Sequence, residues 1–167
     1  IIRNLQVGIG LSLLILIASS VASYWSIQNQ MNHRESLSKS RRSVTAVKDV
    51  LVALLDAETG NRGYQLTGRE DFLEPYKRGV REYSKALVLA ESLGVQDKNQ
   101  QERLTGLKTA VRQVMNNLKN LVENRRRGII MTQQQIISSK VYMDECRKLV
   151  RDFIQYEENQ VEFKNKD

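Results

Sequence analysis

Apolar and polar residues divide the chain into an uncharged first part and a periodic remainder. No charged side chain occurs between Arg3 and His33, and the segment Leu5–Ile27 is largely apolar. As a helix its 23 residues span about 35 Å, enough to cross the hydrocarbon of a bilayer. Tyr24 and Trp25 lie near its end, where amphipathic rings prefer the headgroup layer. We therefore predict a transmembrane helix over residues 1–27. If Arg3 belongs to a cytoplasmic flank, everything after about residue 28 lies outside the cytoplasm.

A cleavable signal peptide is the alternative interpretation of this segment. Its core would be Leu11–Ala18, and Ser20, Val21 and Ala22 would supply the small-residue cleavage site. The apolar stretch is longer than a typical signal core, which favours the membrane anchor. Either interpretation places the remainder in the periplasm or outside the cell.

Four stretches with helical spacing of apolar residues follow the uncharged segment. They cover about 28–67, 70–93, 97–127 and 132–166, and the third has the most regular seam. No alternation typical of β-strands interrupts them. The predicted core positions are Val44, Val47, Leu51, Leu54 and Glu58 in the first stretch; Phe72, Tyr76, Val80, Tyr83, Leu87 and Ala90 in the second; Leu104, Leu107, Val111, Val114, Leu118 and Leu121 in the third; and Ile136, Met143, Cys146, Val150, Phe153, Glu157 and Gln160 in the fourth.

Helix start and stop signals separate the four stretches. Thr67-Gly68, Gly94 and Gly128 are expected to end the first three helices. Pro75 is tolerated only near a helix start, so the residues before it are expected to form a separate tight turn. Asp97 with Gln100, and Thr132 with Gln135, resemble capping boxes that open the third and fourth helices.

This order predicts an all-α, up-down-up-down antiparallel four-helix bundle whose first helix is continuous with the membrane helix. An even number of helices returns the chain to the membrane face that it left. We therefore expect the natural protein to continue after Asp167 into a second membrane span.

Composition and charge exclude several classes of function. Residues 28–167 carry 25 Lys and Arg, all except Arg3, and all 19 Asp and Glu. The two signs alternate along the helices, and the densest basic run, Arg125–Arg127, ends a helix, where cations complement the helix dipole. With no aromatic interleaving and no motif, we expect no nucleic-acid binding.

Catalytic chemistry has equally little support in the sequence. A single histidine, His33, rules out histidine-based metal clusters and Ser-His-Asp triads, and no phosphate-binding loop occurs. Cys146 is the only cysteine, and its helical core position suits a small hydrophobe. We expect neither a metal nor a cofactor, and no catalytic residue in this chain.

The segment 56–76, DAETGNRGYQLTGREDFLEPY, is unusual for a helix. Gly60 and Gly63 each cost about 1 kcal/mol relative to alanine inside a helix, which suggests a close helix–helix approach or a packed turn. Glu58 and Arg62 have the favourable i, i+4 order and lie on or beside the core stripe. The pair is either a structural polar layer, which we favour, or a candidate ligand subsite.

At this segment the chain resembles the third CHASE-type domain family, the extracellular sensing domains of bacterial histidine kinases and cyclases. Asn61 stands where the family commonly has glutamine, and Gln65 where it commonly has an apolar residue. The resemblance implies an all-helical sensor between two membrane spans and supplies no established binding residue. It is carried by Asp56, Glu58, Thr59, Gly60, Arg62, Gly63, Tyr64, Leu66, Thr67, Gly68, Phe72, Leu73, Pro75 and Tyr76.

We therefore expect an extracytoplasmic sensor that relays a small-molecule or protein stimulus by helix displacement in a membrane-embedded homodimer. The receptor is expected to be a histidine kinase, with a chemoreceptor or nucleotide cyclase as alternatives. An inert membrane-anchored spacer or dimerisation stalk is the competing hypothesis, and a membrane-tethered enzyme is a remote third.

Overall fold

The structure is a computed structural model that describes the backbone of residues 2–94 and 97–164. Within these ranges the side chains of residues 2–9, 11, 29, 32, 33 and 164 are not described. The elements are α1 (Ile2–Thr67), the 3-10 helix η1 (Glu70–Leu73), α2 (Glu74–Leu93), α3 (Lys98–Arg126) and α4 (Gln133–Lys164). The described residues form no strand, which confirms the all-α prediction. The predicted helix end at residue 166 lies outside the described residues.

The chain forms two compact units, an N-terminal unit (Ile1–Ser38) and a C-terminal unit (Lys39–Asp167). In the N-terminal unit Leu13 to Ile17 are each more than half exposed, and so are Tyr24 and Trp25. The predicted membrane segment includes side chains at 1–9 and 11 that lie outside the described residues. Among the residues that were described, no helix is both long and apolar enough to cross a membrane.

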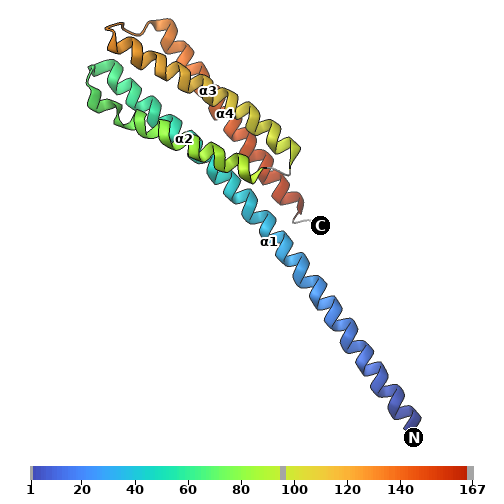
Figure 1. Ribbon diagram of the computed structural model, residues 1–167. Helices are drawn as coiled ribbons and strands as arrows, with labels where there is room; N and C mark the ends of the chain where they lie inside the picture. Colours follow the sequence, from blue (N-terminus) through green and yellow to red (C-terminus); the bar gives the residue numbers. More distant parts are fainter. Residues whose placement is uncertain (1, 95–96, 165–167) are drawn as a thin grey trace. The chain divides into compact units, whose positions relative to one another are not determined.

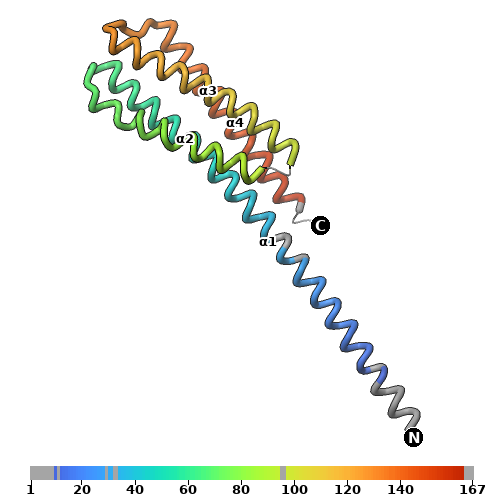
Figure 2. The backbone as a smooth tube through the Cα atoms, viewed as in Figure 1, coloured from blue at the N-terminus to red at the C-terminus, as the bar shows by residue number. Residues whose placement is uncertain are grey.

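One hydrophobic core is shared by four helices of the C-terminal unit: α1 after Ser38, α2, α3 and α4 (Figure 1). Consecutive helices run in opposite directions, as the tube in Figure 2 also shows. α1 and α3 are parallel, since their side-chain contacts join residues with nearly constant separations of 57, 57 and 56 in sequence. The largest fully buried side chains include Val47, Val50 and Leu54 from α1, Leu107, Val111 and Val114 from α3, and Met143, Val150 and Phe153 from α4.

The predicted seam of the third helix is confirmed, because all six of its positions are buried in α3. The core positions predicted for the other three helices are only partly confirmed. Ile136 is 53% exposed because it lies in the first turn of α4, before that helix reaches the core, and Phe72 and Val80 are 42% and 36% exposed. On α1 the core is centred on Val50 and the small residues Ala46, Ala53 and Ala57, while Val44 and Leu51 are only half-buried.

Capping contacts occur where the sequence predicts the starts of the third and fourth helices. The Asp97 carboxylate accepts from the backbone N–H of Gln100 at 3.1 Å. Thr132 and Gln135 form a complete capping box, with the Thr132 N–H donating to Gln135 Oε1 at 2.9 Å and the Gln135 N–H donating to the Thr132 hydroxyl at 3.3 Å. Gly68 and Gly128 end α1 and α3 with φ of +71° and +79°, conformations that favour glycine.

Cys146 of α4 is fully buried in the shared core, and burial raises the pKa of its thiol to about 12. At pH 8 about 0.01% of such a thiol is ionised, and the thiolate is the reactive form. We expect iodoacetamide to leave the folded chain unmodified at pH 8 and to label it once it is unfolded in urea. A Lys148→Cys variant in a Cys146→Ala background, with its thiol on the exposed face of α4, should react within minutes under the same conditions. Equal labelling of both would contradict the buried position of Cys146.

Candidate functional site

The segment 56–76 forms the reversal from α1 through η1 into α2. Gly60 and Gly63 face this returning chain, and their missing side chains make the contact possible. A Cβ on Gly60 would lie 2.5 Å from the backbone nitrogen of Tyr76, and one on Gly63 would lie 2.7 Å from Cδ1 of Phe72. The predicted close approach is therefore confirmed, and it explains two glycines inside a helix.

The turn itself is fixed by backbone and core contacts. The N–H of Gly68 donates to the Tyr64 carbonyl at 2.8 Å, and the Thr67 hydroxyl donates to the Gly63 carbonyl at 2.7 Å. Tyr64 and Leu73 are buried together with Val122 of α3 in a second small core, against which Tyr76 packs. Pro75 occupies the first turn of α2, where its missing N–H costs no helix bond. These contacts assign most of the family-like residues a local structural role.

Two amide side chains join α1 to the main chain of α3. Asn61, which is 2% exposed, donates to the Leu118 carbonyl at 3.0 Å, and Gln65 donates to the Leu121 carbonyl at 2.9 Å. The contacts lie one helical turn apart on both helices. Buried amides need such partners because an unsatisfied polar group costs about 1–3 kcal/mol. Asn61 and Gln65 are the two positions at which the segment departs from the family pattern.

Glu58 is the buried acid of the segment. Its carboxylate lies 2.9 Å from Arg62 on the same helix and 3.6 Å from Arg147 of α4. The Glu58 side chain is 9% exposed and that of Arg62 is 68% exposed, so only the acid is buried. Arg147 also donates to Asp144, and this bond with that of Lys140 lowers the pKa of the Asp144 carboxyl. The arrangement is a polar layer that joins α1 to α4.

Most of the remaining residues of the segment are exposed, and Asp56 is half-buried. Asp56 binds Arg78 of α2 at 3.0 Å, and Arg69 lies over the ring of Phe72. Leu66 is 85% exposed and Thr59 is also exposed, and no described contact explains either residue.

A second set of buried polar contacts joins α1, α3 and α4 near the other end of the shared core. We call it the interhelical polar cluster, and it consists of Ser40, Ser43, Gln100 and Glu157. The Gln100 amide is 3.0 Å from the Ser43 hydroxyl and donates to Glu157 Oε1 at 2.6 Å, and the Ser40 hydroxyl donates to Glu157 Oε2 at 2.5 Å. Glu157 is 5% exposed and Gln100 is 7% exposed.

The sequence pattern predicts only parts of this cluster. Its spacing from Asp97 indicates a capping role for Gln100, but the Gln100 side chain turns away from Asp97 and into the core. Glu157 is placed correctly on the apolar stripe of the fourth helix, and an acid at such a position is the signal that indicates a buried polar contact. Tyr156 extends the contacts by donating to Asp97 at 2.8 Å, and burial and this bond raise the pKa of its hydroxyl.

Gln100→Ala removes the amide that donates to Glu157. We expect the free energy of unfolding to fall by about 2 kcal/mol, since hydrogen bonds to charged groups contribute about 1.5–3 kcal/mol. Urea unfolding followed by circular dichroism would measure the change. Gln113→Ala is the matched control on the exposed face of α3 and should change stability by less than about 0.5 kcal/mol. Equal losses in both variants would show that the contact contributes nothing.

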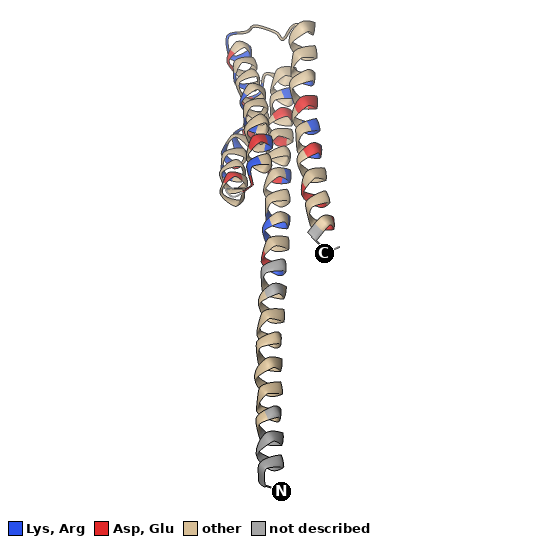
Figure 3. Ribbon diagram, turned by 90° about the vertical axis from the view of Figure 1, so that its right-hand side faces the viewer, with Lys and Arg blue, Asp and Glu red and all other residues tan. Residues whose placement is uncertain are grey.

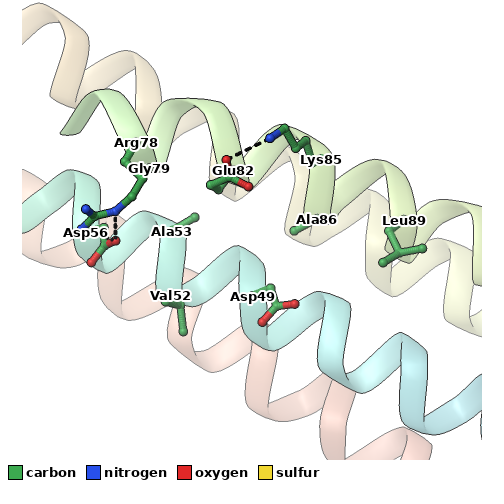
Figure 4. Close-up of a pocket in the computed structure, with 10 residues that line it drawn as sticks. All are labelled: Asp49, Val52, Ala53, Asp56, Arg78, Gly79, Glu82, Lys85, Ala86 and Leu89. Carbon is green, nitrogen blue, oxygen red and sulfur yellow. Dashed lines mark hydrogen bonds and ion pairs between the residues drawn. The ribbon is translucent and has the colours of Figure 1, made fainter. Parts of the chain in front are cut away.

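Open clefts on the described part of the C-terminal unit include the following three. The first, of about 360 Å³, lies between α1 and α2 beside Gly79, where Asp56 pairs with Arg78 and Glu82 with Lys85 (Figure 4). The second, of about 510 Å³, is lined by residues of α2 and α3 around Tyr76. The third, of about 540 Å³, lies between α1 and α4 and includes Ser40 and Glu157. Glu58 and Arg62 line none of these clefts, so the candidate subsite stays a prediction.

Acidic and basic residues are mixed along the helices of the C-terminal unit, as the colours of the ribbon in Figure 3 show. One exposed contact is bidentate: Arg126 Nε and Nη2 donate to Glu70 at 2.9 and 3.0 Å, which lowers the pKa of the Glu70 carboxyl. Among the described residues, no group of three His, Cys, Asp or Glu side chains is placed to hold a metal ion.

Comparison with known families gives one match. The model of the CHASE3 domain matches residues 33–167, which include the whole C-terminal unit. No curated protein and no solved structure matches the chain significantly. CHASE3 domains are sensor domains of signalling receptors, and typically extracellular ones. Because this match covers most of the chain, including the reversal at residues 56–76 and the shared helical core, the protein belongs to the CHASE3 domain family.

Proposed function

We propose that this chain is the extracytoplasmic sensor domain of a bacterial transmembrane receptor whose output is a histidine kinase. Residues 1–27 would cross the membrane, and the C-terminal unit would be an up-down-up-down four-helix sensor bundle. The family match supports the sensor role, and the uncharged segment Leu5–Ile27 supports the membrane anchor. The receptor would act as a homodimer.

The signal would pass as a displacement of α1 relative to α4. The observation that carries this proposal is the interhelical polar cluster, in which Ser40 of α1 and Glu157 of α4 are in direct contact. Packed interfaces with buried polar contacts favour discrete arrangements over continuous deformation. A stimulus that binds one arrangement more tightly than another shifts their populations. α1 itself runs without interruption from Ile2 to Thr67, so the core and the apolar segment share one helix.

Reversible cross-links of chosen length test this proposal. Val44 of α1 and Val161 of α4 line the same cleft, and both would be replaced by cysteine in a Cys146→Ala background within a fusion to a histidine kinase. Short and long methanethiosulfonate cross-linkers would then hold the two helices at different separations. We expect kinase autophosphorylation to differ between the cross-linker lengths and to return to its starting value after reduction.

The control cross-link joins two positions on one helix. Gln101→Cys with Thr105→Cys places both thiols on the exposed face of α3, and every cross-linker length should leave the output unchanged. An inert spacer would give the same kinase output at every length for the α1–α4 pair as well. That result would contradict the displacement mechanism.

A further inference from the structure

The cleft between α1 and α4 has two walls of opposite charge. Arg41 and Lys48 line it from α1, and Glu158 and Glu162 line it from α4. On α1 the spacing of 41 and 48 places both cations on one helix face, and on α4 the spacing of 158 and 162 does the same for the acids. Each wall therefore carries a single sign of charge over about two turns of helix or less.

Three of these four wall charges are not neutralised by a described side chain. Arg41, Lys48 and Glu158 form no ion pair within 4 Å with any described residue. The cleft between α1 and α2 differs in this respect, because its Arg78 and Lys85 are already paired with carboxylates. Groups that a bound molecule could engage are thus available in the α1–α4 cleft and largely occupied in the other.

The size and lining of the cleft define the chemistry that fits it. Its volume of about 540 Å³ is in the range of small-molecule sites, which are about 300–1,000 Å³. Val44 and Val161 add apolar surface between the charged walls. A molecule with one charge would meet attraction from one wall and repulsion from the other, whereas a molecule with both charges can satisfy both.

The geometry points to this cleft as the binding site for a small zwitterion that carries one carboxylate and one ammonium group. The carboxylate faces Arg41 and Lys48, and the ammonium group faces Glu158 and Glu162. This inference rests on the proposed sensor function and names the stimulus class. The site adjoins the contact between Ser40 and Glu157, so a bound zwitterion adds a second bridge between α1 and α4.

A panel of amino acids with increasing separation of charges tests the site in the whole 167-residue chain held in lipid nanodiscs. Glycine, β-alanine, γ-aminobutyrate and 6-aminohexanoate would be added at constant ionic strength, and unfolding would be followed by circular dichroism. An equimolar mixture of propionate and propylammonium supplies both charges on separate molecules. We expect at least one member of the panel to raise Tm in a concentration-dependent manner while the mixture leaves Tm unchanged.

Two charge-neutralising variants identify the walls. Arg41→Gln and Glu158→Gln should each weaken the binding of that amino acid about tenfold in calorimetric titrations, because each removes one charged contact. Both residues are exposed, so the variants should fold normally. Arg112→Gln and Glu102→Gln make the same changes on the exposed face of α3 and should leave the affinity unchanged.

The inference fails if no panel member raises Tm above the mixture, or if both wall variants bind with unchanged affinity. Its failure is distinct from failure of the proposed function. If no amino acid binds but kinase output depends on cross-linker length, the site is ruled out and the displacement mechanism is supported. If the wall variants weaken binding but no ligand or cross-linker alters the output, the site is supported and the mechanism is ruled out.

Discussion

Phe153→Ala is expected to lower the free energy of unfolding by about 3–5 kcal/mol, the largest effect of any single substitution considered. Phe153 is fully buried and is the bulkiest of the core side chains with less than 2% exposure. Truncation to alanine removes its apolar contacts and leaves a cavity that the four surrounding helices can close only in part. Since domains are stabilised by about 5–15 kcal/mol in total, the variant should lose a large part of its stability.

Phe163→Ala provides the matched control for this prediction. Phe163 lies on the same helix and is 72% exposed, so its truncation should change stability by less than about 0.5 kcal/mol. Both variants would be measured by urea unfolding of the whole chain, with helicity as the signal. Comparable losses at the two positions would contradict the placement of the core.

Gly79→Leu is expected to destabilise the C-terminal unit by about 3 kcal/mol, the upper range for overpacking. Gly79 of α2 lies directly against the main chain of α1. A Cβ there would be 2.3 Å from the carbonyl oxygen of Ala53 and 2.9 Å from the backbone nitrogen of Ala57. Backbone atoms cannot change rotamer to make room for the added side chain, so α2 must move away from α1.

Gly106→Leu makes the same change where space is open. No heavy atom outside its own helix turn lies within 4 Å of a Cβ at Gly106 in α3. Leucine is a better helix former than glycine, so this variant should be stabilised by about 0.5–1 kcal/mol. Thermal unfolding would show the contrast as Tm shifts of opposite sign, and shifts of the same sign would contradict the close α1–α2 approach.

The sequence predicted the third helix best because large aliphatic residues alone carry its seam. Leucine and valine occupy all six predicted seam positions from Leu104 to Leu121, so the hydrophobic period is unambiguous. The first helix was predicted less well for a physical reason. Ala46, Ala53 and Ala57 are buried there because small residues allow close helix contact, and alanines barely raise the apolar signal of a stripe.

Polar contacts between residues close in sequence could be predicted, and polar contacts between different helices could not. The pair Glu58–Arg62 and the capping box at Thr132 depend on residues three or four apart, and spacing alone predicts them. The contacts of Glu58 with Arg147 and of Gln100 with Glu157 join residues from different helices. No local rule specifies such partners, because they depend on how the helices align in three dimensions.

The contacts from Asn61 and Gln65 to α3 are made to carbonyl groups of the peptide chain. Every amino acid supplies such an acceptor, so the alignment of these two helices does not depend on which side chains occupy positions 118 and 121. Substitutions at positions 118 and 121 therefore leave both acceptors in place. In related proteins, drift at these two sites should be limited by core volume alone, whereas loss of either amide would release the constraint.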